Sequence, residues 1–191
     1  MRITDIVVIV IQCIWGICEF VIKKKMTASG KNADQKSYKV LYTITIFSLA
    51  LGICIGWLLK FNPVKGLYSA SMVFPVVGSV IILSGLMIRL CAIATLKRYF
   101  TVNVTIQENH KLITSGLYQY IRHPAYAGGI LSFIGCGLCY GNPLSFVCIS
   151  VPYFILILMR IKHEEIVLVN QFGKDYTELQ SKTKKLIPYI F

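Results

Sequence analysis

One run of ten residues, YIRHPAYAGG at positions 120–129, places an arginine, a histidine and two tyrosines directly before an apolar stretch. Proline suits the first position of a helix, so the sequence predicts that a helix starts at His123-Pro124. The positive end of its dipole would lie beside Arg122, where a helix N-terminus can hold an anion such as a ligand carboxylate. Tyr118 lies four residues before Arg122, which predicts a short helix that presents both side chains on one face. The residues would form either a ligand-binding rim or an interfacial belt, since Tyr and Arg commonly lie at headgroup level.

A second polar cluster follows the last apolar run, where Arg160 is followed by the adjacent carboxylates Glu164 and Glu165. Arg160 and Glu164 are one helical turn apart and are spaced to pair. Acids beside the acyl region of a bilayer are costly unless they have partners. Arg122 or His123 would supply such partners, and so would a basic, amine-bearing or ribose-bearing ligand. The alternative without a ligand is a salt-bridged helix face.

The segments that carry these clusters are long and apolar. The 191-residue chain is 55% hydrophobic and 15% charged, whereas average soluble domains carry roughly 25% charged residues. A membrane-spanning helix needs roughly 20 mostly apolar residues. The runs expected to span are 3–22, 40–59, 70–96, 125–140 and 144–159, with a tight turn at Gly141-Asn142-Pro143 between the last two and the last helix continuing past the membrane. The sequence therefore predicts an all-α, polytopic membrane bundle of about five helices, folded as one domain over residues 1–191.

The net charge of +12 is distributed unevenly along the chain. Six lysines lie within 23–39, four Lys and Arg residues within 97–122 and six within 160–185, whereas the opposite loops hold only Arg2, Lys60 and Lys65. The positive-inside rule then predicts that the N-terminus lies outside and that the polar segments and the C-terminus are cytoplasmic. Topology and anionic membrane lipids account for the basic charge, so nucleic acid is not expected as a partner.

Other polar and reactive residues lie inside the apolar runs. All seven cysteines do so, which is typical of buried small hydrophobic residues rather than of a metal or redox site. No metal is therefore expected. Arg89 lies near the end of the third run, where its side chain would either snorkel to the interface or reach a polar cavity. Gly128-Gly129 would let a neighbouring helix or a ligand approach closely.

Together the two polar segments resemble the signature of the isoprenylcysteine carboxyl methyltransferase family. The first block reads His110-x-Leu112-x-x-x-Gly116-x-Tyr118-x-x-x-Arg122-His123-Pro124-x-Tyr126, and the second Arg160-x-x-x-Glu164-Glu165-x-x-Leu168-x-x-x-Phe172-Gly173-x-x-Tyr176, closing with Leu186-Ile-Pro188. The blocks lie in the family's order with one helical hairpin between them and cover roughly the C-terminal half, about residues 96–191. Such proteins look like small integral membrane methyltransferases that use S-adenosylmethionine, with phospholipid N-methyltransferases as relatives.

The resemblance implies roles for individual residues and a reaction. The implied cofactor-binding residues are His110, Leu112, Gly116, Tyr118, His123, Tyr126 and Glu165, and the implied catalytic residues are Arg122, Arg160 and Glu164. The arginines would orient the cofactor or the carboxylate of the substrate. The implied reaction is methyl transfer to a lipid-like or hydrophobic acceptor, foremost a carboxylate as in isoprenylcysteine O-methylation, while amine and thiol acceptors remain open.

Two other functions compete with methyl transfer. Some sterol and steroid reductases share a related R-H-P-x-Y segment, which makes an NAD(P)H-dependent membrane reductase the main alternative. A non-catalytic membrane protein that retains the scaffold is the third hypothesis. Residues 96–100, Leu-Lys-Arg-Tyr-Phe, depart from the family's pattern, and this departure leaves the acceptor open.

Overall fold

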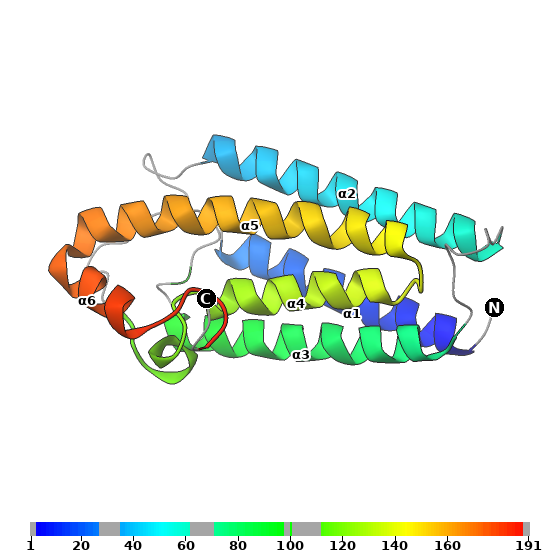
Figure 1. Ribbon diagram of the computed structural model, residues 1–191, viewed down its shortest axis with the longest axis horizontal. Helices are drawn as coiled ribbons and strands as arrows, with labels where there is room; N and C mark the ends of the chain where they lie inside the picture. Colours follow the sequence, from blue (N-terminus) through cyan, green and yellow to red (C-terminus); the bar gives the residue numbers. More distant parts are fainter. Residues whose placement is uncertain (1–2, 27–34, 62–70, 98–99, 101–111, 189–191) are drawn as a thin grey trace.

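The computed structural model describes residues 3–26, 35–61, 71–97, 100 and 112–188. The elements in chain order are α1 (Ile3–Met26), α2 (Gln35–Phe61), α3 (Val73–Leu96), the 3-10 helix η2 (Gly116–Gln119), α4 (Pro124–Leu138), α5 (Pro143–Phe172) and α6 (Lys174–Lys182). The five long helices form an elongated bundle, and α6 packs beyond it at the far end of α5 (Figure 1). Within the described residues the fold is therefore all-α, as the sequence predicts.

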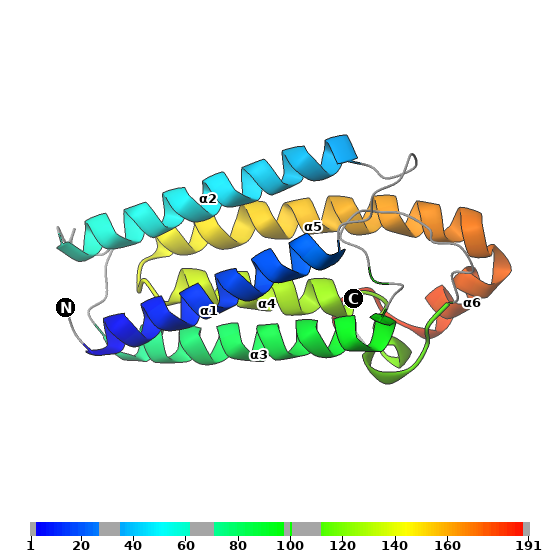
Figure 2. The same cartoon turned by 180° about the vertical axis from the view of Figure 1, so that it is seen from behind.

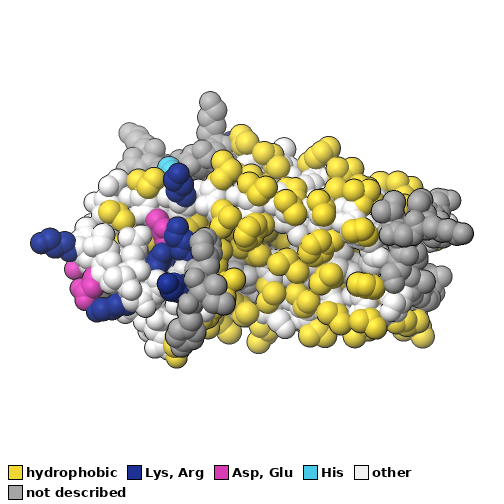
Figure 3. All heavy atoms as spheres, in the orientation of Figure 1, with side chains coloured by type: hydrophobic (Ala, Val, Ile, Leu, Met, Phe, Trp, Pro, Cys, Tyr) yellow, Lys and Arg dark blue, Asp and Glu magenta, His cyan; other side chains and the backbone are white. Residues whose placement is uncertain are grey.

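The helices match the predicted membrane spans, with one difference in length. In the described part of the chain, α1, α2, α3 and α5 are long and apolar enough to cross a membrane, whereas α4 is apolar but has 15 residues. At 1.5 Å per residue α4 rises about 22 Å, less than a hydrocarbon core of about 30 Å. Apolar side chains cover the face of the bundle seen in Figure 3, and charged ones gather at the end that carries α6. The chain is an integral, multi-pass membrane protein.

Helices α3 and α4 approach each other through pairs of glycines. A Cβ added at Gly85 would lie 2.5 Å from the Gly128 carbonyl oxygen, and one at Gly128 would lie 2.5 Å from the Gly85 oxygen. Gly78 and Gly135 show the same reciprocal relation at 2.6 Å. The two pairs are seven residues apart on each helix and so fall on one face. Small residues that let backbones approach are a common device between membrane helices, and the prediction for Gly128 is confirmed.

The turn between α4 and α5 is as tight as the sequence predicts. Gly141 has a φ of 62°, a conformation that favours glycine. Asn142 caps α5, because its side-chain oxygen accepts a hydrogen bond from the Ser145 backbone N–H at 2.7 Å. Helix α5 then runs for 30 residues, about 45 Å at the usual rise. Its C-terminal end therefore extends beyond the bilayer core, as predicted.

The first two helices lie on different partners. Helix α1 packs against α3, and α2 packs against α5 (Figures 1 and 2). Trp15 of α1 meets Phe133 of α4 edge to face with ring centroids 5.0 Å apart, and Phe133 stacks on Tyr153 of α5. These rings join α1, α4 and α5 in the interior of the bundle.

We expect the glycine contacts to limit stability. Replacing Gly85 or Gly128 with alanine places a methyl group against the partner's backbone, which cannot move aside like a flexible side chain. Overpacking costs about 1–3 kcal/mol, more than the roughly 0.5–1 kcal/mol that alanine gains over glycine within a helix. Thermal unfolding in detergent should therefore show a lower midpoint for each variant.

Gly16→Ala is the matched control for these variants, because an added Cβ at this position would have no described atom within 4 Å apart from its chain neighbours and the backbone of its own helix. It receives the same helix-propensity gain without the clash, so its midpoint should equal or exceed that of the parent protein. Equal midpoints for all three variants would contradict the close-packing account.

Candidate active site

The backbone before α4 pairs with residues 183–188, which follow α6 and are called the C-terminal segment. The Arg122 N–H donates to the Lys184 carbonyl oxygen at 2.8 Å, and the His123 N–H donates to that of Lys185 at 3.0 Å. Helix α4 begins at Pro124 with His123 at the N-cap position, which confirms the predicted start. The C-terminal segment thus fixes the R-H-P stretch from outside the helix.

The predicted helix through Tyr118 to Arg122 is wrong. The structure has only the short η2, after which the backbone of Arg122 bonds to the C-terminal segment instead of continuing a helix. Tyr118 packs against Ala92 and Ala125, whereas the Arg122 guanidinium contacts Glu165. The two side chains therefore do not share a helix face.

Glu165 is a buried carboxylate with three cationic or imidazole neighbours. Its Oε1 accepts from Arg122 Nε at 2.8 Å and lies 3.4 Å from His123 Nε2, while its Oε2 lies 3.5 Å from Lys185 Nζ. The residue is 8% exposed, and a buried charge is tolerated when it is paired and hydrogen-bonded. The prediction that Arg122 or His123 partners an acid of the second cluster is confirmed.

Arg122 links three parts of the chain. Besides Glu165 of α5, its Nη1 donates to the Gln180 carbonyl oxygen at 3.3 Å and to the Thr183 carbonyl oxygen. The guanidinium therefore ties the start of α4 to α5, to α6 and to the C-terminal segment. Sequence reasoning did not assign the binding of Arg122 to Gln180 and Thr183, because these acceptors are backbone atoms that no side-chain pattern marks.

Tyr126 joins the other predicted side chains. Arg160 Nε donates to the Tyr126 hydroxyl oxygen at 2.7 Å, and that hydroxyl donates to Glu164 Oε2 at 2.7 Å. The ring stacks on His123 with centroids 5.7 Å apart. The hydroxyl thus bridges Arg160 and Glu164, which the sequence predicts as a pair. The His123 ring connects these residues to Glu165 and its partner Arg122. We call these six residues (Arg122, His123, Tyr126, Arg160, Glu164 and Glu165) the polar network.

The structure describes three of the four remaining predicted residues, Leu112, Gly116 and Tyr118. Leu112 is half-buried, and Gly116 has a φ of 61° at the start of η2. Burial raises the pKa of the Tyr118 hydroxyl, and the negative charge of Glu164 raises it further. Burial and then the charge of Glu165 likewise raise the pKa of Tyr176. His110 lies outside the described residues.

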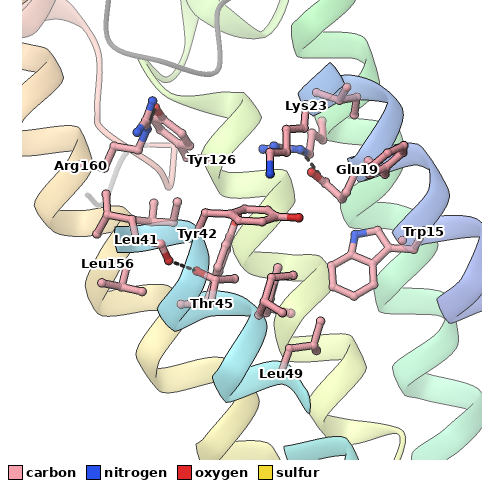
Figure 4. Close-up of a pocket in the computed structure, with 18 of the residues that line it drawn as sticks. Trp15, Glu19, Lys23, Leu41, Tyr42, Thr45, Leu49, Tyr126, Leu156 and Arg160 are labelled. Carbon is pink, nitrogen blue, oxygen red and sulfur yellow. Dashed lines mark hydrogen bonds and ion pairs between the residues drawn. The ribbon is translucent and has the colours of Figure 1, made fainter. Parts of the chain in front are cut away.

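A cavity of about 220 Å³ adjoins the network between α1, α2, α4 and α5 (Figure 4). Its polar end is lined by Tyr126 and Arg160 together with Glu19 and Lys23 of α1. Its remaining walls are mostly apolar and include Trp15, Leu41, Leu49, Phe133, Tyr153, Leu156 and Ile157. Sequence reasoning missed the part that α1 and α2 play here, although Glu19 is an acid within an apolar run.

Arg89 reaches this cavity instead of snorkelling to the interface. Its Nε lies 2.6 Å from Glu19 Oε1, and its Nη1 donates to the Ala125 carbonyl oxygen at 2.8 Å. One guanidinium thereby joins α1 and α3 to the first turn of α4. Of the two sequence expectations for Arg89, the polar cavity is confirmed. No group of three or more His, Cys, Asp or Glu residues among those described is placed to hold a metal ion.

Comparison with known proteins points to one family. The sequence profile of the isoprenylcysteine carboxyl methyltransferase (ICMT) family matches residues 77–170, which include most of α3, all of α4 and nearly all of α5. A probable protein-S-isoprenylcysteine O-methyltransferase of Oryza sativa subsp. indica is 35% identical over 116 residues, or 60% of this chain and 61% of the relative. Protein-S-isoprenylcysteine O-methyltransferase B of Arabidopsis thaliana is 33% identical over 115 residues, or 59% and 58%.

A solved structure shares the arrangement of the helices. It is described as the eukaryotic intramembrane Ras methyltransferase, isoprenylcysteine carboxyl methyltransferase, and matches with a TM-score of 0.62 at 26% sequence identity. The match covers 78% of this chain and 52% of that chain. The chain spans about three fifths of the length of the curated plant relatives that it matches. The profile, the relatives and the shared fold agree that the matched part of this chain is similar to the isoprenylcysteine carboxyl methyltransferase family.

Proposed function

We propose that this protein transfers a methyl group from S-adenosylmethionine to the carboxylate of a lipid-like acceptor of the isoprenylcysteine type. One observation carries the proposal: Tyr126 and Arg160 belong both to the polar network and to the lining of the apolar cavity. A polar cofactor held by the network and a hydrophobic acceptor in the cavity would meet at these two side chains. The names of the relatives, protein-S-isoprenylcysteine O-methyltransferases, support this choice of acceptor.

The residues of the network fit the chemistry of the cofactor. When bound, S-adenosylmethionine supplies an electrophilic methyl group that a carboxylate oxygen attacks as the carbon–sulfur bond breaks. The faces of Tyr118 and Tyr126 would stabilise the positive sulfonium by cation–π contact, worth roughly 0.5–2 kcal/mol. The carboxylates of Glu164 and Glu165 would accept hydrogen bonds from the ribose hydroxyls or the methionine ammonium group.

The protein's main task in this reaction is to position the reactants and exclude water. A carboxylate nucleophile needs no strong base, so orientation and desolvation supply most of the acceleration. Arg160 at the polar end of the cavity would orient the acceptor carboxylate, and its bond to Tyr126 holds the guanidinium in place. The apolar walls would take the adjoining hydrocarbon.

We also infer how the protein is oriented in the membrane. Lys and Arg side chains gather at the end of the bundle that carries α6 (Figure 3). By the positive-inside rule this end and the C-terminus are cytoplasmic and the N-terminus lies outside.

Neither competing hypothesis has support of the same kind. The relatives and the family profile name methyltransferases, which disfavours an NAD(P)H-dependent reductase. A scaffold without catalysis would not require hydrogen bonds that link Arg160, Tyr126 and Glu164 at the polar end of a cavity. A binding experiment separates the three functions.

We expect purified protein in detergent to bind S-adenosylhomocysteine and not NADPH in isothermal titration calorimetry. His123→Ala and Glu165→Gln should each weaken the binding of S-adenosylhomocysteine at least tenfold. The histidine change removes the ring that stacks on Tyr126, and the glutamate change removes the charge that holds Arg122 and Lys185.

Glu178→Gln is the control for charge removal, because Glu178 is an exposed acid that pairs with Lys182 on α6. This variant should bind S-adenosylhomocysteine like the parent protein. Binding of NADPH alone would indicate the reductase, and binding of neither compound would indicate the scaffold.

Tyr126→Phe should lower the rate of methyl transfer while leaving the affinity for S-adenosylhomocysteine nearly unchanged. The change keeps the ring but removes the hydroxyl that joins Arg160 to Glu164, so the acceptor loses its alignment. Misplacement of this kind can cost about 10²-fold in rate. The assay is methyl transfer from radiolabelled S-adenosylmethionine to N-acetyl-S-farnesylcysteine.

Tyr120→Phe serves as the control in the same assay. Tyr120 lies outside the motif and is 50% exposed, so its hydroxyl should not affect the rate. Equal rates for Tyr126→Phe and Tyr120→Phe would exclude a role for the Tyr126 hydroxyl in catalysis.

A further inference from the structure

The cavity has a similar depth on the four helices that enclose most of it. Its lining residues fall within positions 15–23 of α1, 41–49 of α2, 126–133 of α4 and 153–160 of α5. At the usual helical rise each of these stretches spans about 10–12 Å. Helices α1 and α5 run toward the polar end, and α2 and α4 run away from it (Figure 1). The lining residues farthest from the polar end are therefore Trp15, Leu49, Phe133 and Tyr153.

Three aromatic rings and one leucine close this deep end. Trp15 is 4% exposed and meets the Phe133 ring edge to face, with 5.0 Å between the ring centroids. Phe133 in turn stacks on Tyr153, with 3.7 Å between centroids. Leu49 adds a side chain from α2, and Figure 4 shows it on the side of the cavity away from Lys23. Each of the four helices thus contributes one side chain to this layer, which we call the cavity floor.

The interior of the bundle is packed beyond the cavity floor. Trp15 and Phe133 belong to one buried core that also contains Cys136 and Tyr140. Tyr140 lies two turns beyond Phe133 on α4, and its hydroxyl donates to Gln12 Oε1 of α1 at 3.0 Å. A hydrocarbon chain that enters from the polar end therefore stops at the floor.

The volume of the cavity sets how much hydrocarbon it encloses. An apolar cavity of about 150 Å³ holds one benzene ring. By the same measure the 220 Å³ found here holds roughly nine carbon atoms. Two isoprene units are close to this size, as in a geranyl chain. A farnesyl chain has one unit more and is too large to be enclosed.

We propose that Trp15 limits the length of the acceptor's hydrocarbon and that the preferred acceptor carries a chain of about two isoprene units. The proposal rests on the proposed function, which places the acceptor's hydrocarbon against the apolar walls. A longer chain would have to displace the indole from Phe133, and closely packed interiors resist such displacement. Trp15 lies outside residues 77–170, the segment that the family profile matches. The length limit therefore belongs to the N-terminal part of this chain.

Competition between two acceptors tests the length limit. The protein in detergent receives equimolar N-acetyl-S-geranylcysteine and N-acetyl-S-farnesylcysteine together with radiolabelled S-adenosylmethionine, and the ratio of the two methyl esters reports the ratio of kcat/KM. Both acceptors partition into the same micelles in every assay, so a change of ratio between variants reports the protein. We expect the parent protein to favour the geranyl acceptor. Trp15→Ala should shift the ratio at least tenfold toward the farnesyl acceptor, and Trp15→Phe, which keeps a ring at the floor, should shift it less.

Trp57→Ala is the matched control, because Trp57 is the second of the chain's two tryptophans and stacks on Phe61 of α2. Its ratio should equal that of the parent protein. Leu49→Phe adds bulk at the floor and should shift the ratio further toward the geranyl acceptor, so the proposal stays testable if Trp15→Ala does not fold. A parent protein that prefers the farnesyl acceptor, an unchanged ratio in Trp15→Ala, or an equal shift in Trp57→Ala would overturn the length limit.

The length limit and the proposed function can fail separately. Binding without turnover is measured as the rise in unfolding midpoint that each acceptor causes, since a ligand that binds the folded state stabilises it. Methyl transfer with a ratio that does not depend on position 15 would overturn only the length limit. A geranyl preference in binding that Trp15→Ala removes, in a protein that does not bind S-adenosylhomocysteine, would support the length limit and contradict the methyltransferase.

Discussion

The close approach of α3 and α4 is the constraint on which the rest of the site depends. Gly85 and Gly128 bring the two backbones into contact, and an added Cβ at Gly128 would also lie 2.7 Å from the Arg89 backbone nitrogen. Arg89 follows Gly85 by one turn, so this proximity lets its guanidinium reach the Ala125 carbonyl oxygen and Glu19. A wider helix spacing would remove both contacts and, with them, the position of α1 beside the cavity.

The Glu165 carboxylate holds chain segments together at the end of the bundle that carries α6. It contacts Arg122 and His123 at the start of α4 and Lys185 of the C-terminal segment. Because a half-paired buried charge is strongly destabilising, the three segments order together rather than separately. The short turn between α4 and α5 makes this meeting local, since it returns the chain along α4 to the same end of the bundle.

Sequence patterns predicted the features that depend on local chemistry. Run length and composition located the membrane helices, and His123-Pro124 marked the start of α4. The cost of buried acids predicted that Glu164 and Glu165 need partners, with Arg122 or His123 among the candidates. The pairing of residues 122–123 with residues 184–185 involves backbone atoms only and leaves no side-chain signal. For the same reason a helix face was wrongly predicted for Tyr118 and Arg122.

The Tyr126 hydroxyl stabilises a charged side chain, Arg160, at the edge of an apolar cavity. Arg160 must carry its charge to the edge of an apolar space, where an unpartnered cation is costly. By donating to Tyr126, which in turn donates to Glu164, Arg160 is linked to a negative charge that lies on its own helix. The Tyr126 hydroxyl lies between the Arg160 guanidinium and the Glu164 carboxylate and carries this link. This indirect pairing suits a cation whose proposed ligand is itself a carboxylate.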